Sequence, residues 1–265
     1  MTKTTTYLFI TAAFLLGTCP LFAQQSAVDM SQGYVRYLVT HNWTKKMTSL
    51  DYIGPQRREK VQYMWGNDSE WRMYAELYYS EAASKYLDSD ESPDKDINTY
   101  SWKKDAFFIR RDFSANKESD LVTFLGKNYL VDDSLQCPNW KVLNDLKEVA
   151  GHICMSASWE DTLRDQEVIA WFAMDIPSSA GPERFCGLPG LILEIDINNG
   201  AMIVSADKIT FSPITAVQLA LPTKPKGKSI KEADYQTLYA KHIEDKRKNE
   251  DPWFWESGIS LEFRV

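Results

Sequence analysis

The sequence contains few of the residues on which enzyme chemistry and metal binding most often depend. Its 265 residues include only 3 histidines and 4 cysteines. It has no local signature of a serine hydrolase, a zinc protease, a phosphate-binding loop, a dithiol redox site or a dinucleotide site. Its formal net charge of -7 gives no basic surface for nucleic acid. The sequence therefore favours a non-enzymatic protein with no nucleic-acid partner, and it assigns no catalytic residue.

Aromatic residues, by contrast, are abundant. The chain has 9 Trp, 13 Tyr and 12 Phe within a composition that is 44% hydrophobic and 25% charged. These fractions are ordinary for a globular protein and exclude a disordered or low-complexity chain. Because aromatic side chains are enriched in strands, the composition favours a fold rich in β-sheet.

Residues 1–23 have the pattern of a secretory signal peptide. Lys3 is followed by an apolar stretch over residues 7–23 that ends at Ala23, where we expect cleavage. No second long apolar run follows, so we expect no transmembrane span in the mature chain, residues 24–265. We therefore expect an exported protein that is periplasmic, outer-membrane-associated or extracellular and not cytoplasmic. Such a location permits disulfide bonds.

Short strand-like segments follow one another along the mature chain. Alternating apolar residues predict a half-buried strand over residues 70–79, and continuous apolar residues predict a buried one over residues 168–174. Asn199-Gly200 predicts a hairpin between strands at 191–197 and 201–211. The pattern predicts an α+β, sheet-dominated fold with a curved antiparallel sheet, and an open half-barrel is compatible with it.

The composition changes after Pro222. Residues 223–228 form a basic linker. Ser229 and Glu232 fit a capping box, which predicts a helix over about residues 230–248. We expect a few helices, including this C-terminal one, within a single domain over residues 24–265.

A glycine-rich motif occupies residues 187–192 and reads Gly187-Leu188-Pro189-Gly190-Leu191-Ile192. Proline fixes φ at about −65° and glycine readily takes positive φ, so Leu-Pro-Gly-Leu predicts a type II turn. Such a turn would be a structural corner that sets the register of the next strand. A ligand or partner site formed by exposed glycine amides is the alternative.

The sequence around this motif resembles the GLPGLI family. The resemblance extends over most of residues 30–215 and includes the segments 151–154, 175–177 and 181–182 and the strand at Trp140. The family is known mainly from Bacteroidetes as secreted or envelope proteins and has no established biochemical activity. The resemblance therefore implies an envelope location and a similar architecture, and it implies no reaction.

Three cysteines remain after signal removal: Cys137, Cys154 and Cys186. A hairpin loop at residues 144–147 would place Cys137 opposite Cys154, with His152 on the same strand face as Cys154. One interpretation is a disulfide between two of the three cysteines, with the third left as a free buried thiol. Another is that all three are inert small hydrophobic residues.

The same residues permit two kinds of chemistry. A metal site formed by Cys137, His152, Cys154 and Cys186 would suit Cu(I) or Zn(II). Alternatively, Cys154 or Cys186 could act as a nucleophile with His152 as its base, as in a hydrolase. No recognised catalytic sequence surrounds either cysteine.

Three hypotheses for the function follow. The leading one is a non-enzymatic binding or accessory protein of the envelope that acts with an outer-membrane partner or an apolar ligand and needs no cofactor. The alternatives are a copper- or zinc-binding protein and an uncharacterised hydrolase.

Overall fold

The computed structural model describes residues 28–66, 70–93, 106–223 and 225–251. The expected signal peptide, residue 224 of the basic linker and residues 252–265 lie outside the described residues.

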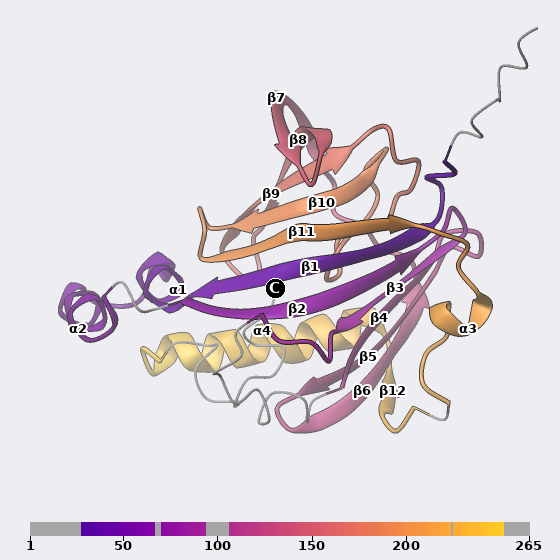
Figure 1. The fold of residues 1–265 in the computed structure, drawn as a ribbon. Coiled ribbons are helices and arrows are strands. Elements are labelled where there is room, and N and C mark those ends of the chain that lie inside the picture. The colour runs from indigo at the N-terminus through magenta and orange to yellow at the C-terminus, as the bar shows by residue number, and fades with distance from the viewer. Residues whose placement is uncertain (1–27, 67–69, 94–105, 224, 252–265) are drawn as a thin grey trace, which may run out of the picture.

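Twelve strands form one open mixed sheet (Figure 1), in the order β12-β6-β5-β4-β3-β2-β1-β11-β10-β9-β8-β7. Neighbouring strands pair antiparallel, except that β12 pairs parallel to β6. The sheet-dominated class predicted from the sequence is confirmed, and a half-barrel is not. The strands are β1 (Gly33–Asn42), β2 (Glu70–Tyr79), β3 (Ala83–Asp88), β4 (Phe107–Asp112), β5 (Lys117–Phe124), β6 (Lys127–Ser134), β7 (Lys141–Val149), β8 (His152–Asp161), β9 (Gln166–Ala173), β10 (Leu191–Ile197), β11 (Met202–Phe211) and β12 (Lys228–Ile230).

Four helices accompany the sheet in the described residues: α1 (Trp43–Ser49), α2 (Pro55–Trp65), α3 (Ala216–Leu219) and α4 (Glu232–Lys248). None of these described helices has both the length and the apolar character needed to cross a bilayer. The predicted C-terminal helix is α4, but its predicted capping box does not form. Ser229 lies in β12, and the backbone N–H of Glu232 donates instead to the Asp133 carboxylate of β6, at 3.2 Å. A residue distant in sequence therefore caps this helix.

Helix α4 contacts both halves of the sheet. The Phe124 ring of β5 stacks on Tyr239 of α4 with centroids 5.0 Å apart. The Arg164 guanidinium, in the turn after β8, lies 4.2 Å from the centroid of the same Tyr239 ring. Strands β5 and β8 are separated by seven other strands in the sheet. The sheet therefore curves around α4, which lies across one of its faces (Figure 1).

The segment between β9 and β10 adds to the core. Ile176, Phe185 and Leu188 are all buried there. Strand β10 follows this segment and is buried at nearly every position, and the Tyr37 hydroxyl of β1 donates to the backbone carbonyl of Ile192 at 2.6 Å. The glycine-rich motif thus lies at the end of a buried segment that crosses the sheet.

The hairpin predicted with a loop at residues 144–147 is wrong. The β7–β8 turn lies at Ala150 and Gly151, so that Val149 is opposite His152. Both turn residues have positive φ, 49° and 84°, which is the requirement of a tight type I′ hairpin turn. The predicted loop lies within β7, where the register shifts between Val142 and Leu146.

This correction changes the position of the cysteines. Lys147 is opposite Cys154 in the observed register. Cys137 lies before the start of β7 and has no place in the hairpin ladder. The predicted pairing of Cys137 with Cys154 across the hairpin is therefore wrong as well.

Candidate functional site

Cys137 and Cys186 form a disulfide that joins the segment before β7 to the segment before β10. They are 49 residues apart in sequence, with Cα atoms 5.2 Å apart. Cys154 is a free, buried cysteine. Burial raises the pKa of the Cys154 thiol to about 11, so it is protonated at neutral pH.

The predicted four-residue metal site is not assembled in this disulfide-bonded form. The sulfur atoms of Cys137 and Cys186 are bonded to each other and cannot act as thiolate ligands. Among the described residues, no three His, Cys, Asp or Glu side chains form a group suited to a metal ion. His152 instead pairs through Nδ1 with an Asp175 carboxylate oxygen at 2.8 Å.

The disulfide and the burial of Cys154 also argue against a cysteine nucleophile. Cys186 is oxidised in the disulfide, and the raised pKa of Cys154 makes its thiol a poor nucleophile. The described residues thus give neither cysteine the activation that a hydrolase requires.

The glycines of the motif are required by close packing. Gly187 has φ +94°, and a Cβ placed on it would lie 2.8 Å from the Cβ of Cys137. Gly190 does not have the positive φ of the predicted type II turn, and a Cβ there would overlap the backbone carbonyl of Ala173. The prediction of a structural corner at this motif agrees with these contacts, whereas the predicted turn type is wrong.

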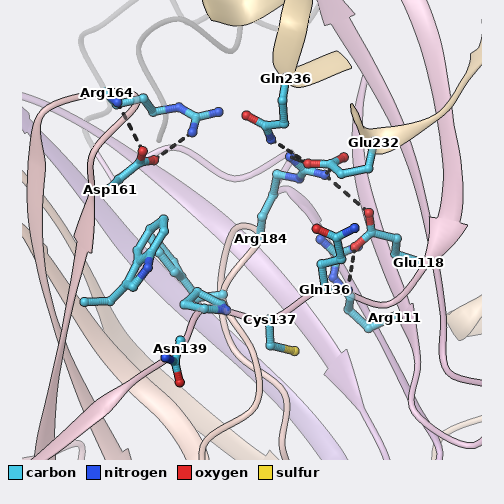
Figure 2. A pocket seen from close by; sticks show the side chains of 13 residues that line it. Arg111, Glu118, Gln136, Cys137, Asn139, Asp161, Arg164, Arg184, Glu232 and Gln236 are labelled. Atoms are coloured by element: carbon cyan, nitrogen blue, oxygen red, sulfur yellow. Dashed lines mark hydrogen bonds and ion pairs between the residues drawn. The ribbon is translucent and has the colours of Figure 1, made fainter. Parts of the chain in front are cut away.

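A pocket of about 250 Å³ lies beside the disulfide. One wall is the segment from Gln136 to Asn139, which includes Cys137. Arg184 and Phe185 line it just before Cys186, and Trp159 lines it from β8. Asp161 of β8, Arg164 of the turn after it and side chains of α4, β4 and β5 complete the lining. The side chains of Arg164, Gln236 and Glu232 lie across the pocket from Asn139 and Cys137 (Figure 2).

Arg184 is the centre of the charged side of this pocket. Its Nε donates to Asp120 of β5 at 2.9 Å. Its two terminal nitrogens donate to the two carboxylate oxygens of Glu232 at 3.0 and 2.6 Å. Burial alone would raise the pKa of Glu232, but the charge and hydrogen bonds of Arg184 outweigh burial and hold this pKa below its ordinary value. One guanidinium thus ties the segment before the motif to β5 and to α4.

Two further arginines of the pocket are paired within the protein. Arg111 of β4 binds the buried carboxylate of Asp120. Arg164 donates to Asp161 of β8 at 2.7 Å. Because each of these guanidinium groups already has a carboxylate partner, the described residues of the pocket lining offer no unpaired cation to a phosphate or carboxylate ligand.

Several buried polar atoms of the pocket nevertheless lack hydrogen-bond partners in the described part of the chain. They are Glu118 Oε1, Arg111 Nε and Arg164 Nε. Glu118 is 1% exposed, and its Oε1 atom lies 3.8 Å from an Arg184 nitrogen, an ion pair longer than a hydrogen bond. The other carboxylate oxygen of Glu118 accepts from the backbone N–H of Gln136 at 3.2 Å. A buried polar atom without a partner costs about 1–3 kcal/mol, so these atoms mark places where a bound polar group would add stability.

Aromatic rings form the other side of the pocket. Phe185 and Trp159 have ring centroids 6.3 Å apart, and Trp140 packs against both rings. The Trp140 indole N–H donates to the backbone carbonyl of Cys186 at 2.8 Å. The disulfide region therefore fixes the position of the aromatic side as well.

Sequence reasoning missed this site. Glu118 and Asp120 are charged residues just before the apolar run that starts at Leu121, yet β5 is buried from Glu118 through Phe124. The sequence feature that could have indicated this site is the pair of acidic residues at alternate positions at the start of a buried strand, since buried carboxylates need positively charged partners. Nothing local in the sequence indicates that Arg184 is their partner.

Comparisons with known proteins show the fold and a family match. No curated protein matches this sequence significantly. Two solved structures of PNGF-II, in the P21 and C2 space groups, have TM-scores of 0.53 and 0.52 at 11% and 12% identity. They match 79% and 78% of this chain, which spans about a third of theirs (33% and 32%). At this identity the likeness shows the fold alone.

The family comparison covers the region that contains Trp159, the disulfide cysteine Cys186 and the glycine-rich motif. Residues 158–194 match the model of the family described as "Protein of unknown function (Porph_ging)", the family typified by the GLPGLI motif in Bacteroidetes, and the resemblance seen in the sequence is thereby confirmed.

Proposed function

We propose that this chain is an exported, non-enzymatic binding protein that takes a polar ligand into the pocket beside the Cys137–Cys186 disulfide. The observation that carries the proposal is the set of buried polar atoms in the pocket lining that make no hydrogen bond among the described residues: Glu118 Oε1, Arg111 Nε and Arg164 Nε. Atoms of this kind are usually satisfied by a bound molecule or by ordered water.

The lining favours a polar ligand over the apolar one suggested by the sequence. Three arginines face three carboxylates in it, and Gln136, Asn139 and Gln236 add neutral amides. An apolar molecule would bury these groups without giving them partners, which is unfavourable. Because the charges in the lining balance, the site suits an uncharged or zwitterionic ligand better than an ion.

Export forms part of the proposal. The disulfide supports it, because structural disulfides persist in oxidising compartments outside the cytoplasm. The signal-like residues 1–23 provide the route. An accessory role beside an outer-membrane partner would fit the same location.

Isothermal titration of the mature protein with small probes tests this proposal. The probes are glucose, N-acetylglucosamine, glycine betaine, lysine, inorganic phosphate and palmitate. We expect a neutral or zwitterionic probe to bind and palmitate not to bind. Gln136→Trp places a large ring at the exposed mouth of the pocket and should weaken binding at least tenfold.

The matched control is Gln56→Trp, the same substitution at an exposed position of α2. It should leave binding unchanged. Binding of palmitate alone, binding of no probe, or equal affinities for the two tryptophan variants would contradict the proposal.

A further inference from the structure

A second hollow of about 730 Å³ adjoins the pocket. The two share Asn139 and Trp159, so these side chains form the border between them. The hollow extends over β7, β8 and β9 and is lined by Ser158 and Gln166 among others. Gln166 Oε1 is buried and has no hydrogen-bond partner among the described residues. The second hollow therefore has the same kind of unsatisfied polar group as the pocket.

The sizes of the two spaces indicate an extended ligand. Sites for single small molecules usually measure about 300–1,000 Å³. The pocket, at about 250 Å³, is below this range and suits one small unit. The hollow beside it is about three times as large and has room for more units. A ligand that satisfies polar atoms in both spaces must cross Trp159.

The chemistry of the lining indicates the kind of unit. Neutral groups that both donate and accept hydrogen bonds occur in both spaces: Gln136, Asn139 and Gln236 in the pocket, and Ser158, Gln166 and Asn198 in the hollow. Ligand hydroxyls also both donate and accept, so they match such groups in either direction. Trp159 adds a flat apolar surface suited to the C–H face of a sugar ring.

The charged residues of the hollow narrow the class of ligand further. Glu160, Asp165 and Glu167 line the hollow together with one cation, Lys141. This excess of carboxylates opposes acidic ligands. Neutral sugars and amino sugars are compatible with it.

We propose that the two spaces form one binding site for a neutral oligosaccharide, with one sugar unit in the pocket and the following units crossing Trp159 into the hollow. The inference rests on the proposed function, since it names the ligand class of the same pocket. It adds the second hollow as an independent part of the site.

Isothermal titration of the mature protein with sugars of one to six units tests the inference. The probes are the series built from glucose, from N-acetylglucosamine and from mannose, with tetralysine as a basic peptide. We expect at least one series to bind, with affinity rising at least tenfold from one unit to four. Ser158→Trp, which fills the hollow, should remove this gain while changing the affinity for one unit less than twofold.

Gln166→Ala provides a second variant, because it removes a ligand-binding group without adding bulk. It should weaken binding of the four-unit sugar several-fold and leave the thermal midpoint within a few degrees of wild type. Gln56→Trp again serves as the matched control and should change neither affinity.

The outcomes separate the two proposals. If single sugars bind but longer chains bind no better, the oligosaccharide inference is overturned and the proposed function is supported. Binding of tetralysine without binding of any sugar series overturns the inference in favour of a basic peptide. If neither the sugars nor the small probes bind, both proposals fail.

Discussion

Gly187 lies directly against Cys137, and a Cβ on that glycine would be 2.8 Å from the Cβ of the cysteine. Cys137 is bonded to Cys186, the residue just before Gly187. The first glycine of the motif therefore packs on the disulfide that it adjoins in sequence. Since Cys137, Arg184 and Phe185 all line the pocket, this contact connects the motif to the pocket wall.

Gly187→Ala should destabilise the protein more than Gly126→Ala. Both glycines have positive φ, +94° and +70°, so both variants bear backbone strain of about 1–2 kcal/mol. A Cβ at Gly126 meets nothing within 4 Å, whereas one at Gly187 meets Cys137. We expect Gly187→Ala to cost about 1–3 kcal/mol more in urea unfolding. Equal losses would show that the contact with Cys137 is unimportant.

Removal of the disulfide should destabilise the folded protein. The double variant Cys137→Ala with Cys186→Ala should lower the free energy of unfolding by about 2–5 kcal/mol.

Thiol labelling of the wild-type protein, residues 24–265, should modify one cysteine, Cys154, and only after denaturation, because this residue is buried. Labelling of three cysteines, or rapid labelling of the native protein, would contradict the pairing.

Arg184→Met should strongly destabilise the fold. It leaves the buried carboxylate of Glu232 without its arginine partner and removes one of the two arginines that bind Asp120. Removing one partner of a buried ion pair typically costs about 3–5 kcal/mol. Arg57→Met is the control, since Arg57 pairs at the surface with Asp251 and should lose about 1 kcal/mol or less. Denaturant unfolding of both variants measures the contrast, and similar losses would argue against a central role for Arg184.

The contribution of Glu232 should depend on pH. Its folded-state pKa is lowered, so its stabilisation is present above its unfolded-state pKa and is lost as the pH falls through its folded-state pKa. The stability difference between wild type and Glu232→Gln should therefore stay constant from about pH 7 to pH 5.5 and shrink toward pH 3.

Glu244→Gln is the control in the same helix. Glu244 is exposed and pairs only with Lys248 among the described residues. Its substitution should change stability by about 0.5 kcal/mol or less at neutral pH. A difference for Glu232→Gln that stays constant down to pH 3 would show that its carboxylate is not held ionised by Arg184.

Strands with a strong local pattern were predictable from the sequence. The alternation over 70–79 corresponds to β2, and Asn199-Gly200 does join β10 to β11. Positive φ at both Asn199 and Gly200 is what that dipeptide favours. In these segments the local preference and the tertiary packing agree.

The features that depend on distant contacts were not predictable. Ala150-Gly151 forms the β7–β8 turn although Asn144-Asp145 has stronger turn character, and the whole register of that hairpin follows from this choice. The partner of Cys137 depends on how the segment before β10 folds back across the sheet. The pocket combines side chains from β4, β5, β8 and α4, which become neighbours only when the sheet curves around that helix.

The most direct test of the account follows the tryptophan indole N–H signals of ¹⁵N-labelled protein by NMR during titration with the best-binding oligosaccharide. The signal of Trp159 is assigned with Trp159→Phe, and that of Trp171 of β9, which does not line either space, with Trp171→Phe. We expect the Trp159 signal to shift in a saturable manner and the Trp171 signal to stay in place. A saturable shift of Trp171 without any shift of Trp159 would show that the oligosaccharide does not bind across Trp159.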